Sequence, residues 1–165
     1  MRALALTGEE MLAWNEHTTA GWRKLVTEQP EILTLPCDIY TAKTVGELLQ
    51  HIVALEQRYA ERIAGVAETP YEQVKFGSAE EIYATHDRAV EMLRAMLADA
   101  EFDWEKALEF QTISSGRLRS TRRTVFFHAL LHATRHYAQL ATLVRQHGVK
   151  PGFMMDYLIM GAERV

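Results

Sequence analysis

The chain has 165 residues, of which 48% are hydrophobic, enough to fill one sizeable core, so a single domain covering residues 1–165 is expected. Its net charge of -4 is spread over 18 basic and 22 acidic side chains, which argues against a nucleic-acid partner. The single cysteine, Cys37, excludes an intrachain disulfide, and no apolar run approaches the length of a membrane span. Residues 1–6 are too short for a secretory signal, so we expect a cytoplasmic protein with no membrane partner.

Four segments combine helix start signals with helical spacing of apolar residues. Capping-box pairs precede three of them: Thr7 with Glu10, Thr44 with Glu47, and Ser78 with Glu81. The predicted helices cover about residues 8–28, 45–64 and 79–98, and a fourth, free of Pro and Gly, covers about residues 120–147. With no clear strand pattern beside them, these segments predict an all-α four-helix bundle.

Three segments connect or follow these helices. Residues 30–43 contain two prolines and read as a long connection across the bundle, with Leu33, Leu35 and Tyr40 packing like a lid. Residues 100–116 include Trp104, Phe110 and Ile113 and fit either a short helical turn or an irregular crossing. Residues 148–165 are rich in apolar side chains, and we expect them to fold back onto the bundle end or onto a partner.

A short basic stretch interrupts the otherwise mixed charge pattern. Arg117, Arg119, Arg122 and Arg123 could bind phosphate. Beside a predicted helix start, such a stretch more often forms a solvated face or ion pairs between subunits. We prefer that second interpretation.

Three of the seven histidines, His128, His132 and His136, fall in the last predicted helix. Residues four apart stack on one helix face, so two neighbouring imidazoles of this set can converge on one ion. The eight-residue step from His128 to His136 advances about 12 Å along the axis, too far for all three to share one site. One of the three must therefore be a bystander.

His51 lies inside the apolar pattern of the second predicted helix and could supply a further ligand. Three imidazoles suit zinc, nickel, copper or ferrous iron, and they leave a coordination position for water or substrate. The opposing interpretation is that the histidines form hydrogen bonds across the bundle or lie on a solvated face. Spacing alone does not decide between these two interpretations.

Two stretches resemble the DinB family, also called the DinB/YfiT-like superfamily of metalloenzymes. FFHALLHATRHYAQLATLVRQHG is similar to its last-helix signature, and TVGELLQHIVALEQRYAERIAG is similar to its second-helix signature. The pair Trp14 and Asn15 in the first predicted helix extends the likeness over nearly the whole chain.

The resemblance implies an up-down-down-up bundle with long crossover connections, often dimeric, that binds one divalent metal through one histidine of the second helix and two of the last. The ligands then fall on His51, His132 and His136, and His128 becomes the bystander. Many members place Arg after the final ligand, whereas this chain has Tyr137, which puts an Arg-dependent substrate contact in doubt.

Several residues are candidates for supporting roles. Glu47, Glu56 and Gln139 could accept the second ring N–H of a ligand histidine, although each glutamate taken alone is more often exposed. His17, His86 and His147 have no partners at ligand spacing, so we expect them at the surface or at helix caps. No catalytic base is assigned.

Three functions fit these features. The first is an enzyme with a small molecule as substrate and Zn, Ni or Fe as its metal. The resemblance implies that the metal activates a low-molecular-weight thiol, because related members include thiol-dependent S-transferases and isomerases. Activation of water for hydrolysis is the neighbouring variant. An open coordination position in a pocket lined by Trp14, Trp22, Tyr40 and Phe127 would favour it. The second is a non-enzymatic stress-response bundle that binds a metal or ligand, favoured by a fourth protein ligand. The third is a bundle that binds no metal. We also expect a homodimer from the resemblance.

Overall fold

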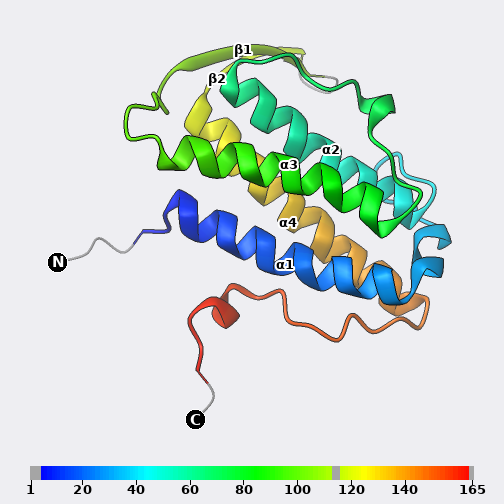
Figure 1. The fold of residues 1–165 in the computed structure, drawn as a ribbon. Coiled ribbons are helices and arrows are strands. Elements are labelled where there is room, and N and C mark those ends of the chain that lie inside the picture. Colours follow the sequence, from blue (N-terminus) through cyan, green and yellow to red (C-terminus); the bar gives the residue numbers. More distant parts are fainter. Residues whose placement is uncertain (1–4, 113–115, 164–165) are drawn as a thin grey trace.

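The computed structural model describes residues 5–112 and 116–163. Ile113, the first four residues of the N-terminal segment and the last two residues of the chain lie outside these ranges. Within them the chain is mostly helical, with four long helices and a small two-stranded sheet (Figure 1). The helices are α1 (Gly8–Glu28), α2 (Val45–Ala64), α3 (Ala79–Ala98) and α4 (Arg122–Gln146), close to the four predicted segments.

A hydroxyl side chain caps the N-terminus of each long helix. The caps, which accept a hydrogen bond from the backbone N–H three residues later, are Thr7, Thr44, Ser78 and Thr121. Glu10 completes the capping box of α1 by accepting from the Thr7 N–H at 2.8 Å. Glu47 and Glu81 instead accept from the N–H groups of Lys43 and Gly77, one residue before the cap. The predicted starts of α2 and α3 are confirmed. The full capping box predicted for them is wrong, because the glutamate does not accept from the N–H of the cap residue itself.

The helices pack so that α1 and α2 each contact both α3 and α4. In Figure 1, α1 and α4 run from left to right, whereas α2 and α3 run from right to left. Buried apolar side chains fill the interior in two clusters, one around Trp22, Ile52 and Leu140 and the other around Ile63 and Phe126. This interior positions α2 beside α4, and these two helices carry the predicted ligands.

The segment before α4 forms a β-hairpin, which corrects the expectation of no strands. Strand β1 (Ala107–Thr112) pairs antiparallel with β2 (Gly116–Thr121), and Glu109 lies opposite Arg119 in the register. The hairpin docks through Phe110, whose ring lies under the Arg62 guanidinium at 4.5 Å. Because most outward side chains of β2 are polar or charged, its alternation carries little apolar signal.

The basic stretch is held by contacts within the chain. Arg117 forms an ion pair with Glu109 across the hairpin, and Arg123 lies 4.0 Å from a carboxylate oxygen of Glu105. The Arg122 guanidinium stacks on the Phe102 ring at 4.4 Å. These contacts use the basic side chains to fasten the hairpin and the start of α4.

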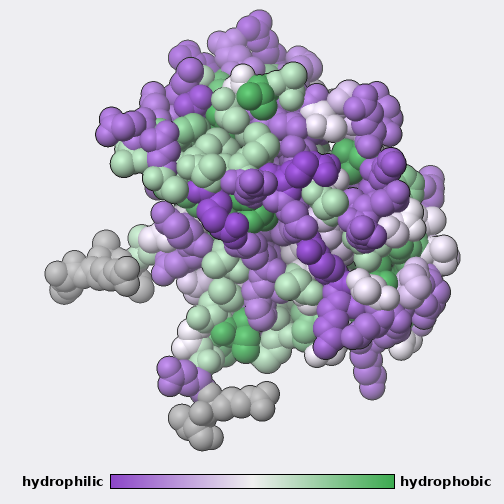
Figure 2. All heavy atoms as spheres, viewed as in Figure 1, coloured by the Kyte–Doolittle hydropathy of each residue, from purple (hydrophilic) through white to green (hydrophobic). Residues whose placement is uncertain are grey.

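The C-terminal segment folds back along the side of α1, whereas the bundle end or a partner was expected. The Trp14 Nε1–H donates to the Met155 carbonyl at 2.8 Å, and Phe153 packs edge-on against the Trp22 ring. The segment ends in a short 3-10 helix, η3 (Tyr157–Met160). In Figure 2, hydrophilic side chains cover most of the visible face, and a hydrophobic area lies at its lower edge over this segment.

The connection between α1 and α2 is partly ordered by its own hydrogen bonds. It opens with the 3-10 helix η1 (Pro30–Thr34), and an isolated bridge then pairs Pro36 with Thr44. The Cys37 N–H donates to the Lys43 carbonyl at 2.9 Å, which closes the loop of residues 37–43. Tyr40, at the tip of this loop, has a left-handed backbone with φ of 57°. Of the expected lid residues, Leu33 is buried and Leu35 is half-buried, but Tyr40 is largely exposed.

Candidate metal centre

Three histidines from two helices meet at one point. His132 and His136 lie one turn apart on α4, and their Nε2 atoms are 3.2 Å apart. His51 on α2 places its Nε2 3.3 Å from that of His132. One ring nitrogen from each of the three lies within 4.8 Å of the others, an arrangement that could hold a metal ion. The structure thus brings together the three residues that the sequence singled out.

The spacing of these nitrogens fits a small divalent cation. A tetrahedral ion with metal–nitrogen bonds of about 2.0–2.1 Å separates its ligand nitrogens by roughly 3.3–3.4 Å. The two Nε2–Nε2 distances of 3.2 and 3.3 Å are close to that edge length. Two of the three pairs therefore already have this spacing, and the third, His51 with His136, lies within 4.8 Å.

Hydrogen bonding among the three rings does not explain their convergence as well. An imidazole nitrogen carries either one N–H or one lone pair, so it can make one good hydrogen bond to another imidazole. His132 Nε2 has two such neighbours, at 3.2 and 3.3 Å. A cation that accepts a lone pair from each ring satisfies all three nitrogens together.

The surroundings keep the imidazoles uncharged. Burial, followed by the neighbouring His136 and Arg135, lowers the pKa of His51 to about 4. Burial lowers the pKa of His132 to about 3, again with help from the other histidines and Arg135. The pKa of His136 is also lowered, first by burial and then by Arg135, while Gln139 acts in the opposite direction. Neutral imidazole is the form that binds metals.

His128 stands apart from this cluster, as the family resemblance implied; helical geometry alone required one bystander without naming it. Its ring centroid is 5.8 Å from that of His132, and the ring packs edge-on against Tyr59 at 5.3 Å. Burial lowers its pKa, and the side chain is half-buried. The residue borders the site without joining the converging nitrogens.

The glutamates proposed to support the ligands have other partners. Glu47 accepts from the Lys43 N–H at 2.6 Å, and Glu56 points into the opposite side of the bundle. Of the three candidates, only Gln139 interacts with a ligand histidine: its side chain raises the pKa of His136. The His136 Nδ1 nonetheless has no partner with hydrogen-bond geometry among the described residues. Glu47 and Glu56 therefore do not support a ligand, and they are not exposed either: Glu47 is half-buried and Glu56 is buried.

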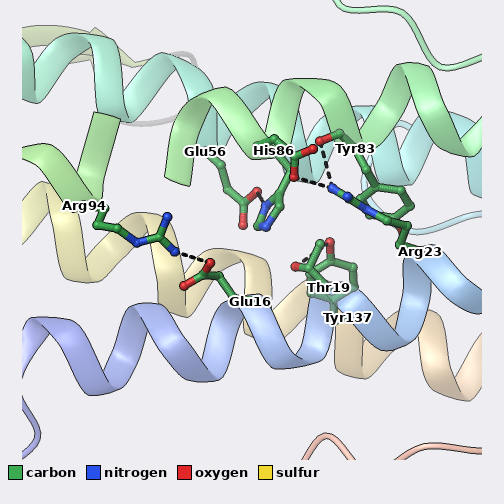
Figure 3. A network of polar contacts seen from close by, with 9 residues as sticks. Glu16, Thr19, Arg23, Glu56, Tyr83, His86, Arg94 and Tyr137 are labelled. Carbon is green, nitrogen blue, oxygen red and sulfur yellow. Dashed lines mark hydrogen bonds and ion pairs between the residues drawn. The ribbon is translucent and has the colours of Figure 1, made fainter. Parts of the chain in front are cut away.

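A buried polar network surrounds Glu56 (Figure 3). The His86 Nδ1 lies 2.7 Å from one Glu56 oxygen. The Asn15 amide donates to the other Glu56 oxygen at 2.9 Å. All three side chains are buried, which contradicts the expected surface or cap position of His86. His86 lies on the apolar face of α3, one turn after Ile82, and this position could have revealed its burial. His17 and His147 are exposed, as expected.

A cavity of about 250 Å³ opens beside His51. Tyr40 lies at its rim, with a ring centroid 4.9 Å from that of His51. Tyr71 and Phe76 also line it, from the connection between α2 and α3, and no local sequence signal predicted this position for them. Glu47 is the acidic side chain among its lining residues.

The other aromatic residues expected at the pocket serve the core or the surface. Trp22 is fully buried and stacks on Tyr137 at 6.0 Å. Trp14 holds the C-terminal segment, and Phe127 packs edge-on against Phe126. Only Tyr40 of the predicted four lines the cavity beside His51.

Arg135 is the charged neighbour of the cluster that sequence reasoning missed. Its Nη2 lies 3.4 Å from the Nε2 of His136. Tyr137, where the resemblance led us to look for an Arg, is buried and accepts a hydrogen bond from the Thr19 hydroxyl at 3.3 Å. A guanidinium therefore reaches the site from the position before the last histidine.

Comparisons with known proteins complete this picture. Among the described residues, none of the helices combines the length and apolar character needed to cross a membrane. No curated protein matches the sequence. The family model described as DinB family matches residues 1–162. With the histidine cluster in place and the match covering nearly its whole length, the chain belongs to the DinB family.

Proposed function

We propose that the protein is a metal-dependent enzyme that binds one divalent cation through the Nε2 atoms of His51, His132 and His136. The observation that carries this proposal is the separation of those atoms by 3.2 and 3.3 Å, the spacing of neighbouring ligands on a tetrahedral ion. Three protein ligands leave one coordination position for water or substrate, which is typical of catalytic sites. Zn, Ni and Fe all accept an imidazole set of this kind.

The proposed reaction is either thiol-dependent S-transfer or hydrolysis of a small molecule. The metal would lower the pKa of a bound thiol or water and so supply a nucleophile near neutral pH. The cavity beside His51 has room for a small substrate or a low-molecular-weight thiol. Cys37 is not that thiol, because it is buried and burial raises its pKa.

We extend the proposal to the topology of the bundle, the oligomeric state and the location in the cell. We assign the helices to the up-down-down-up bundle with long crossover connections, supported by their directions in Figure 1 and by the contacts of α1 and α2 with α3 and α4. We also propose one domain over residues 1–165, a homodimer and a cytoplasmic location. Light scattering tests the dimer, and a monomeric mass would refute it.

The metal site is tested by elemental analysis of protein purified without a metal-affinity tag. We expect roughly one metal ion per chain in the native protein. His132→Ala, and the double change His51→Ala with His136→Ala, should lose it. His128→Ala is the matched control on the same helix and should keep it. Absence of metal from the native protein, even after reconstitution, would refute the metalloenzyme proposal.

The reaction is tested on the metal-loaded protein with small thiols and an electrophilic acceptor. S-transfer predicts consumption of the thiol that depends on the metal and disappears in His132→Ala. Hydrolysis predicts turnover without added thiol. A protein that holds its metal but turns over neither class of substrate would support the alternative, a non-enzymatic bundle that binds a metal or a ligand.

A further inference from the structure

Arg135 lies beside the three candidate ligands, and no salt bridge among the described residues holds its side chain there. Its Nη2 is 3.4 Å from the His136 Nε2, and its side chain is exposed at the surface of α4. That nitrogen has a single lone pair, which a metal would also use. The guanidinium and a cation therefore compete for the same lone pair, and metal binding would release the guanidinium.

The released guanidinium would have no acidic partner in the described part of the chain. Several other arginines form salt bridges with carboxylates, but Arg135 forms none among the described residues. The groups that shift the pKa values of His51, His132 and His136 include Arg135 but no carboxylate. Glu47, the acidic residue of the adjoining cavity, is hydrogen-bonded to the Lys43 N–H.

The charge balance of the site follows from these contacts. Three neutral imidazoles do not offset the charge of a divalent cation, and Arg135 adds a further positive charge beside it. Positive charge removed from water is costly unless an opposite charge pairs with it, and an anionic ligand would supply that charge. A guanidinium recognises anions through several N–H groups at once, and such charge-assisted hydrogen bonds are the stronger kind.

We propose that Arg135 binds an anionic group of the ligand held at the metal, so that the site selects anionic over neutral ligands. The inference rests on the metal site proposed above and adds the chemical class of the ligand: a thiolate, a carboxylate or a similar small anion. It also explains how a chain with Tyr137 after the last histidine still presents a guanidinium to the site.

The test compares an anion with a neutral molecule at the same metal. The protein is loaded with Co²⁺, and the visible absorption of the cobalt reports the binding of azide, the anion, or of imidazole, the neutral probe. Arg135→Gln should weaken azide binding about 10- to 100-fold, the value of a charge-assisted hydrogen bond, and leave imidazole binding unchanged. Arg135→Lys should lie between the two proteins, because it keeps the charge but not the planar fork.

Two further measurements separate this role from a structural one. Co²⁺ itself should bind Arg135→Gln as tightly as the native protein or more tightly, since a nearby positive charge is removed. Arg145→Gln, the same charge change in the last turn of α4, should alter neither probe.

Equal azide affinity in Arg135→Gln and native protein would overturn the inference and leave the metal site intact. Weaker Co²⁺ binding in Arg135→Gln would also overturn it, by showing that the side chain holds the site together. Failure of the native protein to bind Co²⁺ would overturn both the inference and the proposed function.

Discussion

At the residue scale, His132 is the most strongly perturbed member of the histidine cluster. Burial is the main cause that lowers its pKa to about 3, and the same cause lowers that of His51 to about 4. Both values lie well below the ordinary 6.5 of histidine. Folding therefore imposes a cost on protonating these rings, and that cost couples stability to pH.

The metal-free protein should lose stability as the pH falls. Between about pH 6.5 and pH 4 the unfolded chain takes up protons on these histidines while the folded chain does not, so protons favour unfolding. Stability from this source is complete well above pH 6.5, and we expect each of the two histidines to account for a loss of up to about 2 kcal/mol between pH 7 and pH 5. Urea unfolding of chelator-treated protein measures it.

The matched variant for this pH effect is His132→Gln, which cannot titrate. Its loss of stability over the same pH range should be smaller than that of the native protein. His17→Gln, a change at an exposed histidine, should leave the pH dependence as it is. An identical pH dependence in His132→Gln and native protein would contradict the prediction.

The buried pair of Glu56 and His86 is a second residue-scale feature. Removing one partner leaves a buried polar or charged group without its hydrogen bond. His86→Leu should therefore cost about 3–5 kcal/mol of unfolding free energy, measured in urea. The double change with Glu56→Leu should cost less than the sum of the two single changes. Simple additivity would show that the two side chains do not stabilise each other.

At the scale of elements, α1 packs closely against the C-terminal segment at Gly21, where the Phe153 ring lies on the helix. A Cβ on this residue would lie 2.3–2.6 Å from ring atoms of Phe153, much closer than atoms can pack. Alanine normally stabilises a helix interior relative to glycine by roughly 0.5–1 kcal/mol. Here the steric conflict with the ring should outweigh that gain.

Gly21→Ala should therefore release the C-terminal segment from α1. We expect faster limited proteolysis after residue 148 and a lower unfolding free energy. In a Phe153→Ala background the ring is gone, so the same Gly21→Ala change should become neutral or stabilising. If Gly21→Ala stabilises the native chain as well, the packing of Phe153 on Gly21 does not persist in solution.

The elements differ in how far the sequence reveals them. A hydroxyl cap and a stripe of apolar residues are local signals, and α1, α2 and α3 begin at the predicted caps for that reason. For α4 no cap was predicted, and the helix begins two residues after its expected start, behind Thr121. The hairpin of β1 and β2 depends on distant contacts, such as Phe110 with Arg62, that no local window contains. The same limit explains why Tyr71 and Phe76 could not be placed beside His51.

At the scale of the whole molecule, the histidine cluster joins α2 to α4. Helical spacing shows that two of the three histidines on α4 can share an ion, but it does not say which two. The place of His51 opposite them depends on how α2 and α4 pack, so the residues offered it only as a possible further ligand. The family resemblance was therefore needed to choose His51, His132 and His136. A cation held by both helices would bind the folded chain in preference to the unfolded one.

Metal should therefore raise the melting temperature. At a free metal concentration about 100 times Kd, mass action adds about 2.7 kcal/mol to the unfolding free energy. Calorimetry of chelated and Zn²⁺-loaded protein measures the shift, which His51→Ala should abolish and His128→Ala should retain. A shift of equal size in His51→Ala would place the stabilising ion elsewhere.

Closure of the loop of residues 37–43 allows the reactivity of Cys37 to report access to the histidine cluster. The thiol is buried, and the bond from its N–H to Lys43 fastens the same loop that sets Tyr40 against His51. A thiol reagent can reach the Cys37 thiol only in molecules in which the loop of residues 37–43 has opened. The labelling rate therefore reports the fraction of molecules with an open loop. Ligands that bind in the cavity should slow the labelling of Cys37. Comparing how much each ligand lowers the labelling rate would rank candidate substrates before any reaction is known.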